Sequence, residues 1–250
     1  MLHRLTSAAS IPPSVNQRKI IVLQSFGHEL WIHDGSEIMG AAGFHYPTRM
    51  AVIRLSRGGL WIWSPTALSD ELGRAVDALG PVQALIAPNT LHHTFMGEWS
   101  AAYPEAQIYL LPELAGKRLD LKVAEALSDR PASLWAGEIE QVVFTGNALL
   151  TECVFFHHAS GTALFTDLLQ NLPVDWYRGW RKLVARLDLM TEQIPTVPRK
   201  FRMAFRDRAL ARAALDRVES WPVERVLMAH GAPISSGGRD FLSRAFRWLQ

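Results

Sequence analysis

The stretch Val82–His93, VQALIAPNTLHH, joins a short apolar run to a loop that ends in two histidines. The run Val82–Ala87 is typical of a strand that is buried on both faces of a sheet. The chain then predicts a helix over Thr94–Tyr103 and a second buried strand over Gln107–Leu111. This order of strand, loop, helix and strand favours a layered α/β fold over a β-sandwich.

The residues before this stretch predict a β-rich first third that ends in a helix. Strands are expected at Ile20–Ser25, Glu29–His33 and Glu37–Met39, with a turn at Asp34-Gly35, and a hairpin is expected over Met50–Ser56 and Leu60–Trp63. A helix then begins near Pro65 or Ser69, and Gly80-Pro81 ends it.

The second half of the chain predicts further strands and a long helical segment. The strands are expected at Ile139–Phe144, Glu152–Phe156, Thr162–Thr166 and Arg225–Ala229, and the helices at Asp175–Leu189, Arg199–Val218 and Gly238–Gln250. We find no composition break that marks a second domain. The sequence therefore predicts a single domain over residues 1–250 with a helical insertion at 168–221.

Composition excludes several classes of protein. The chain has 250 residues, 48% of them hydrophobic, and a net charge of +2, so disorder, a coiled coil and a nucleic-acid footprint are not expected. A single cysteine cannot form an internal disulfide, which favours a reducing, cytoplasmic location. The sequence shows no apolar window of membrane-spanning length and no signal peptide, so no membrane partner is expected. With nine histidines, any transition-metal site must use imidazole and carboxylate.

Chemistry-bearing residues follow several predicted strands directly. They are His92 and His93 after Val82–Ala87, His157 and His158 after Glu152–Phe156, Asp167 after Thr162–Thr166, and His230 after Arg225–Ala229. If these strands run in similar directions, the side chains converge on one edge of the sheet. Neutral imidazole and carboxylate suit zinc first, with iron or manganese as alternatives.

Each of these residues also has an ordinary structural interpretation. An adjacent histidine pair is common in loops, Asp167 is placed to cap a helix, and His230-Gly231 can be a simple turn. The coincidence of four strand ends is what favours a metal site. The other histidines, His3, His28, His33 and His45, have no such setting.

Several segments together resemble one protein family. They are Arg49–Leu55 with Leu60–Pro65, Pro88–His93, Gly97-Glu98-Trp99, Tyr103–Ala106, Glu152–Asp167 (ECVFFHHASGTALFTD) and Met228–Gly231. They are similar to a divergent branch of the metallo-β-lactamase fold superfamily, the DUF4336 group. The resemblance implies an αββα sandwich with a metal site at one edge of two sheets.

The superfamily's H-x-H-x-D-H loop is only partly matched in this chain. His92 and His93 correspond to its last two positions, but Pro88 and Thr90 stand where the first two histidines are expected. A shift by one residue places Asn89 at the second histidine and Leu91 at the aspartate, which matches no better. The resemblance implies further ligands at His157, which precedes Ser160-Gly161, at Asp167 and at His230.

Without the first two histidines, the remaining candidates suffice for one metal ion with an open position. The sequence thus predicts a metal-dependent hydrolase that acts on an unknown small molecule, with one ion held by His93, His157, Asp167 and His230, and His92 alongside. Whether His92 is a ligand or a proton acceptor stays open, as does the role of His158. The alternatives are a scaffold that kept the fold without catalysis and a redox or oxygen-handling metal protein.

Two other features of the chain are weaker indications of function. The basic stretch Arg199–Arg212 could contact nucleic acid, but Met203, Leu210, Ala214 and Val218 predict a buried stripe with the arginines on a solvated face. The insertion carries Trp176 and Trp180 and could form a lid over the histidines.

Overall fold

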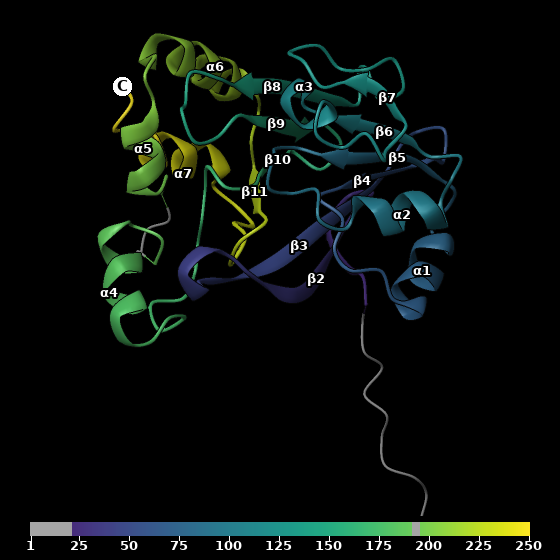
Figure 1. Ribbon diagram of the computed structural model, residues 1–250. Helices are drawn as coiled ribbons and strands as arrows, with labels where there is room; N and C mark the ends of the chain where they lie inside the picture. Colours follow the sequence, from purple (N-terminus) through teal and green to yellow (C-terminus); the bar gives the residue numbers. More distant parts are fainter. Residues whose placement is uncertain (1–21, 192–195) are drawn as a thin grey trace, which may run out of the picture.

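Two β-sheets pack face to face, and helices cover their outer faces (Figure 1). The structure is a computed structural model that describes residues 22–191 and 196–250. One sheet has seven strands in the order β1-β2-β3-β4-β5-β6-β7, and the other has four in the order β11-β10-β9-β8. This αββα sandwich confirms the predicted α/β fold class.

The first sheet is formed by the first half of the chain. Its strands are β1 (Gln24–Gly27), β2 (Leu30–Met39), β3 (His45–Arg54), β4 (Leu60–Trp63), β5 (Val82–Ala87), β6 (Gln107–Leu110) and β7 (Val123–Ala126), with helices η1 (Ala41–Gly43), α1 (Asp70–Asp77), α2 (Met96–Ala102) and α3 (Pro112–Ala115). Strands β1 to β4 pair antiparallel, and β4 to β7 pair parallel.

The second sheet is formed by the second half of the chain. Its strands are β8 (Ile139–Phe144), β9 (Glu152–His157), β10 (Thr162–Phe165) and β11 (Arg225–Met228), with helices α4 (Gly179–Leu187), α5 (Arg199–Ala204), α6 (Arg208–Ser220) and α7 (Gly238–Ala245). Strand β9 is antiparallel to both of its neighbours, while β10 and β11 are parallel. In the described part of the chain no helix is long and apolar enough to cross a membrane.

Strand β4 shows how the sequence forms the layers. Its residues are all buried, because successive side chains point to opposite faces of the sheet and both faces are covered. Trp61 and Trp63 point into the core between the sheets, and Leu60 and Ile62 pack under α1 and α2. Ser69, one of the two predicted starting points of this helix, caps α1 by accepting the backbone N–H of Leu72.

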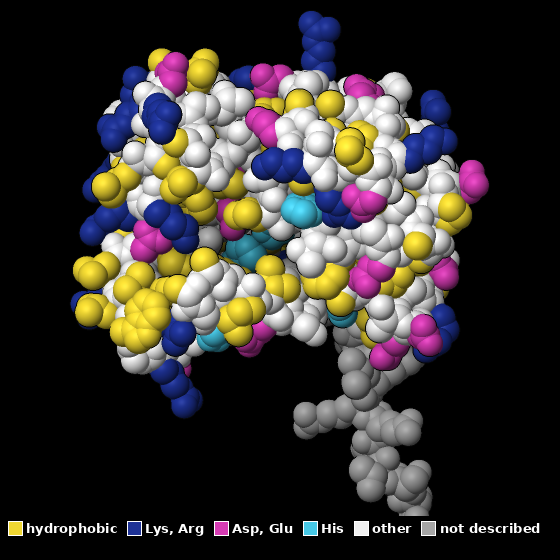
Figure 2. Space-filling model, viewed as in Figure 1, with side chains coloured by type: hydrophobic (Ala, Val, Ile, Leu, Met, Phe, Trp, Pro, Cys, Tyr) yellow, Lys and Arg dark blue, Asp and Glu magenta, His cyan; other side chains and the backbone are white. Residues whose placement is uncertain are grey.

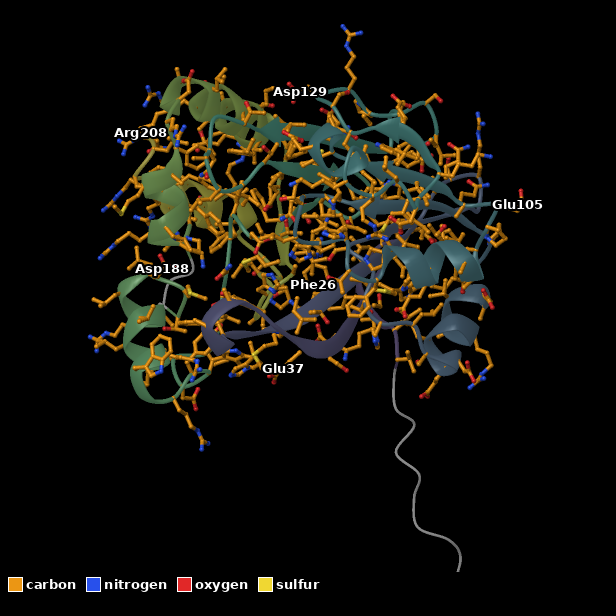
Figure 3. The ribbon with its side chains drawn as sticks, viewed as in Figure 1. Phe26, Glu37, Glu105, Asp129, Asp188 and Arg208 are labelled. Atoms are coloured by element: carbon orange, nitrogen blue, oxygen red, sulfur yellow. The ribbon has the colours of Figure 1, made fainter. Side chains whose placement is uncertain are left out.

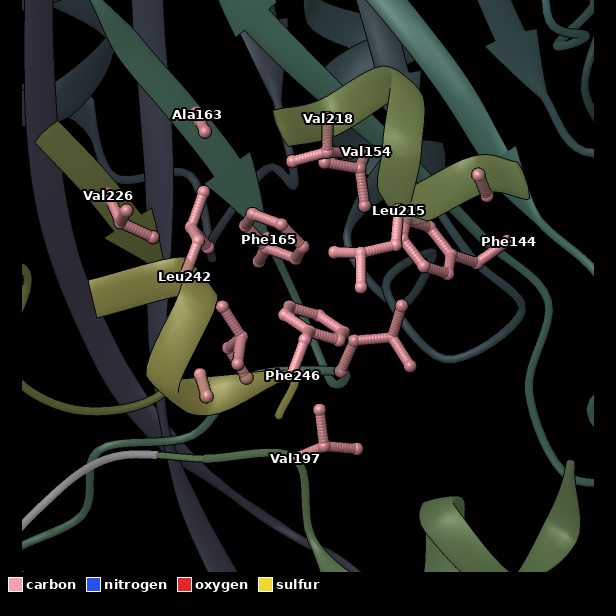
Figure 4. Packing of buried hydrophobic residues seen from close by; sticks show 14 of the residues in the cluster. Phe144, Val154, Ala163, Phe165, Val197, Leu215, Val218, Val226, Leu242 and Phe246 are labelled. Atoms are coloured by element: carbon pink, nitrogen blue, oxygen red, sulfur yellow. The ribbon is translucent and has the colours of Figure 1, made fainter. Parts of the chain in front are cut away.

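The outer face of the second sheet has its own apolar core. Val154 and Phe165 point away from the first sheet and pack with Leu215 and Val218 of α6 and with Phe246, the residue that follows α7 (Figure 4). The two sheets are therefore each fixed from both sides, which makes the edges between them rigid supports for loops.

The expected turn at Asp34-Gly35 is wrong. Strand β2 runs through both residues, and its pairing with β3 shifts register between Gly35 and Ile38. A Cβ on Gly35 would lie 2.5 Å from the Thr48 Oγ1 atom. The glycine therefore permits close approach inside an irregular strand instead of marking its end.

The expected single helix over Arg199–Val218 is also wrong. Helix α5 ends at Ala204, and α6 begins after Asp207, whose carboxylate accepts the backbone N–H groups of Ala209 and Leu210. The break changes the direction of the helical face. The predicted buried stripe is thus divided: Ala214 and Val218 are buried, whereas Met203 and Leu210 are 76% and 50% exposed.

Candidate metal centre

Two pairs of parallel strands, one pair in each sheet, bring loops from both sheets to the same edge of the sandwich. In the first sheet β4 and β5 are parallel, and Ser64 and His92 follow them. In the second sheet β10 and β11 are parallel, and Asp167 and His230 follow them. Residues from both sheets meet at this edge, where Figure 2 shows a histidine at the floor of a hollow in the surface.

The side chains of His92, Asp167 and His230 form a compact group with all ligand atoms within 4.8 Å of one another. The two Nε2 atoms are 3.2 Å apart, His92 Nε2 is 3.3 Å from Asp167 Oδ2, and His230 Nε2 is 3.4 Å from Asp167 Oδ1. Ligands about 2.0–2.1 Å from a tetrahedral zinc ion lie about 3.3 Å from one another. The donor set therefore fits one divalent ion.

The far nitrogen of each imidazole ring is held by a neighbour. His230 Nδ1 lies 2.8 Å from the carbonyl oxygen of Pro47, and His92 Nδ1 lies 2.7 Å from Ser64 Oγ. A carbonyl oxygen only accepts, so Nδ1 of His230 donates to Pro47, and Nε2 is the ring nitrogen that faces Asp167. This outer hydrogen bond is the usual way that a metal-ligating histidine is oriented.

Asn89 connects the loop after β5 to the turn after β10. Its Oδ1 atom accepts the backbone N–H groups of Leu91 and His92 at 2.8 and 2.9 Å, which fixes the loop. Its Nδ2 atom donates to Asp167 Oδ2 at 2.7 Å and to Thr166 Oγ1 at 2.8 Å. Asn89, which lies between the two positions where the superfamily has histidines, thus fixes the geometry of the site.

Glu152 supports the turn that carries Asp167, and the sequence pattern did not predict it as a residue of the site. This fully buried carboxylate accepts the backbone N–H groups of Thr166, Asp167 and Leu168 at 2.7, 2.8 and 3.1 Å. Burial and the Asp167 charge raise its pKa to about 7, although the hydrogen bonds oppose the rise. The available signal was a lone acidic residue at the start of an apolar strand.

Arg49 and Gly231 position the loop that carries His230. The Arg49 guanidinium donates to the carbonyl oxygens of Met228, at 2.9 Å, and of Gly231. Gly231 has a φ of +96°, and a Cβ there would lie 1.9 Å from the Asn171 carbonyl oxygen. Only glycine therefore fits at this position without moving the loop.

Burial and charge set the protonation of the group. Burial lowers the pKa of His92, although the Asp167 charge opposes the shift. Burial alone would raise the pKa of Asp167, but His92 and His230 outweigh it and hold that pKa well below its usual range. A neutral imidazole beside an ionised carboxylate is the protonation state that metal binding requires.

The structure places His93 away from this group. Its Nδ1 atom lies 2.9 Å from the Arg118 guanidinium, and its carbonyl oxygen accepts from the same side chain. Adjacent residues in this loop point in different directions, so His92 reaches Asp167 and His230 and His93 does not.

His157 lies at the opposite end of the sheet from Asp167. Because β9 is antiparallel to β10, His157 pairs with Thr162 at the start of β10. Its Nδ1 atom lies 2.8 Å from Ser160 Oγ, and His158 lies 3.2 Å from Glu140. The condition that these strands run in similar directions fails for β9, whose first residue, Glu152, reaches the site instead.

The architecture and the place of the donor set define a protein of the metallo-β-lactamase fold. The chain is similar to the DIM-1 metallo-β-lactamase exposed to ceftazidime (13% identity, TM-score 0.60, 91% of this chain and 97% of that one). It is similar to FIM-1 from Pseudomonas aeruginosa in the mono-zinc form (12%, 0.59, 91% and 93%). It also matches a metal-soaked Flv1 flavodiiron core from Synechocystis sp. PCC6803 (11%, 0.61), covering 91% of this chain but only 60% of that one. At these identities the likeness shows the fold alone.

Within that fold the chain belongs to the DUF4336 family, described as a domain of unknown function. The family model matches residues 28–176, which is more than half of the chain. No curated protein matches the sequence. The resemblance drawn from the sequence motifs is thereby confirmed at the level of family and fold.

Proposed function

We propose that this protein is a metal-dependent hydrolase whose single ion is held by His92, Asp167 and His230. The observation that carries the proposal is the geometry of these donor atoms, which lie 3.2 to 3.4 Å apart with the outer nitrogen of each ring already engaged. The proposed substrate is a small molecule with an ester or similar electrophilic bond.

The donor set also bears on which metal is bound. Two imidazoles and one carboxylate form catalytic zinc sites, and the same set holds non-haem iron. Zinc is the first choice, since one similar structure is described as a mono-zinc form, and a flavodiiron core keeps iron as the alternative. Manganese is the last choice, because it prefers carboxylate and other oxygen ligands to imidazole.

In such a site the bound ion would supply Lewis acidity and a water of lowered pKa. The chain itself contributes orientation and charge. Pro47 and Ser64 fix the ring planes of His230 and His92, and Asn89 holds one carboxylate oxygen of Asp167. The buried carboxylate keeps a negative charge at the position where a cation is to be held.

The test is the metal content of the full chain purified without a histidine tag. Elemental analysis should find about one zinc or iron per wild-type chain. The ion should be lost in His230→Ala and kept in His158→Ala, a matched control because that residue lies on the surface. A folded, metal-free wild type would contradict the proposal.

A non-catalytic metal-binding or interaction scaffold is the second candidate. The loop after β5 favours it, because Pro88 and Thr90 stand where the superfamily has histidines and three protein ligands remain. A screen with thioester, lactone and phosphodiester substrates separates the two functions. Turnover that His230→Ala abolishes supports the hydrolase, and stoichiometric metal without turnover supports the scaffold.

A further inference from the structure

Helix α4 carries an apolar face that the rest of the described chain leaves uncovered. Trp180, Leu183, Val184 and Leu187 are 54%, 60%, 41% and 55% exposed. Their spacing of three and four residues places them along one side of the helix. Ala185, the buried residue of α4, lies on the opposite side and faces the protein. Figure 2 shows this concentration of hydrophobic side chains at the lower left, over α4.

Basic side chains border this apolar face. Exposed or half-buried members are Arg178, Arg181, Lys182 and Arg186 on and beside α4, and Arg199 and Arg202 on α5. The Arg181 guanidinium lies 4.7 Å from the centre of the Trp180 ring. Asp188, which lies between α4 and α5 (Figure 3), is paired with Lys200 at 3.3 Å. The charge around the apolar face is thus strongly positive.

The apolar surface continues inward from the helix. A groove of about 710 Å³ runs between α4, α5 and η1, and Val184, Leu187, Phe44 and Met203 line it together with Arg199. Met203 is itself 76% exposed. The helix and the groove therefore form one apolar surface with cations at its border.

We propose that α4 docks this protein on an anionic membrane surface. A short helix with tryptophan and leucine on one side and arginine and lysine around it is the pattern of a segment that lies in the interface of a bilayer. The apolar side chains enter the boundary between headgroups and acyl chains, and the basic side chains contact lipid phosphates. This departs from the sequence-based expectation of no membrane partner, which rested on the lack of a spanning segment.

The charge pattern argues against a second copy of the chain as the occupant. A two-fold interface sets the same surface against itself, so the basic border of this face would meet the basic border of the partner. Anionic phosphates neutralise these cations instead.

The test uses the full chain and vesicles made of phosphatidylglycerol and phosphatidylcholine, or of phosphatidylcholine alone. We expect co-sedimentation with the anionic vesicles, which weakens as salt is raised, and little binding to the neutral ones. Lys182→Ala and Arg186→Ala should each weaken binding about fivefold. Leu183→Gln should weaken it on the order of tenfold, because a buried leucine would be lost from the lipid.

Lys117→Ala and Leu119→Gln are the matched controls, since both side chains are exposed and follow α3, which lies at the top of Figure 1, away from α4 at the lower left. They should bind as wild type does. The proposal is overturned if the anionic vesicles do not bind, or if the controls weaken binding as much as the α4 variants. It is also overturned if the wild type is a dimer in size-exclusion chromatography and Leu183→Gln makes it a monomer.

Discussion

His157 and His230 look alike in the sequence and are opposites in the structure. Each follows an apolar strand of the second sheet, and each has a buried ring with Nδ1 engaged by a neighbour. His230 follows β11, which is parallel to β10, and lies beside Asp167. His157 is the last residue of β9, which is antiparallel to β10, and it therefore lies at the opposite end of the sheet from Asp167. Strand direction therefore decides which buried histidine can take part in the site.

Removing each histidine in turn is the strongest way to break this comparison. His230→Ala should lower metal affinity by far more than the roughly 10–100-fold typical of losing an outer hydrogen-bond partner, because the variant loses a proposed ligand. His157→Ala should leave the metal content unchanged. Competition with a zinc chelator measures both affinities, and equal losses in the two variants would show that the two ends of the sheet are not distinct in function.

Glu152 gives the next largest effect, on stability. Glu152→Leu leaves three backbone N–H groups of the Asp167 turn without an acceptor, so the free energy of unfolding should fall by about 3–5 kcal/mol. Glu152→Gln keeps one acceptor oxygen and should cost less. Urea unfolding followed by circular dichroism measures the difference, and a Leu variant as stable as the Gln variant would contradict the role assigned to the hydrogen bonds.

The sequence predicted the layers better than the site. Alternation in β4 and the apolar run of β5 specify buried strands locally, because burial on both faces requires apolar residues at every position. Strand direction is a property of pairing, and no residue within Glu152–His157 records it. The structure brings Asp167, His230 and His92 together. The places of His93, His157 and Glu152 depend on turns and strand pairing that the sequence pattern does not contain.

The dependence of stability on pH tests the comparison through the buried ring of His157. Burial lowers the pKa of His157 to about 4 from its ordinary value of 6.5. The unfolded chain thus takes up a proton at a higher pH than the folded chain does. Above pH 6.5, protonation of His157 does not affect the free energy of unfolding. As the pH drops from 6.5 towards 4, this free energy falls by about 3 kcal/mol in all.

In His157→Gln this part of the acid destabilisation should disappear, which gives a shallower dependence of unfolding free energy on pH. His158→Gln removes a neighbouring charge that adds to the lowering of the His157 pKa, so it should change the pH dependence less than His157→Gln does. Glu138 opposes the shift, and His158 adds to it. Identical pH dependence in the wild type and His157→Gln would contradict a buried, neutral His157.

The smallest effect compares the two serines that contact a histidine Nδ1. Ser64 Oγ lies 2.7 Å from His92, and Ser160 Oγ lies 2.8 Å from His157. Ser64→Ala removes the group that orients a proposed ligand, so metal affinity should fall by about 10–100-fold while the ion still binds at saturation. Ser160→Ala removes an equivalent contact at the other edge and should leave affinity unchanged. The corresponding partner of His230 is the Pro47 carbonyl, which no side-chain substitution deletes. If Ser64→Ala binds metal as tightly as the wild type, then the contact to Ser64 does not orient a ligand, and His92 lies near the ion without coordinating it.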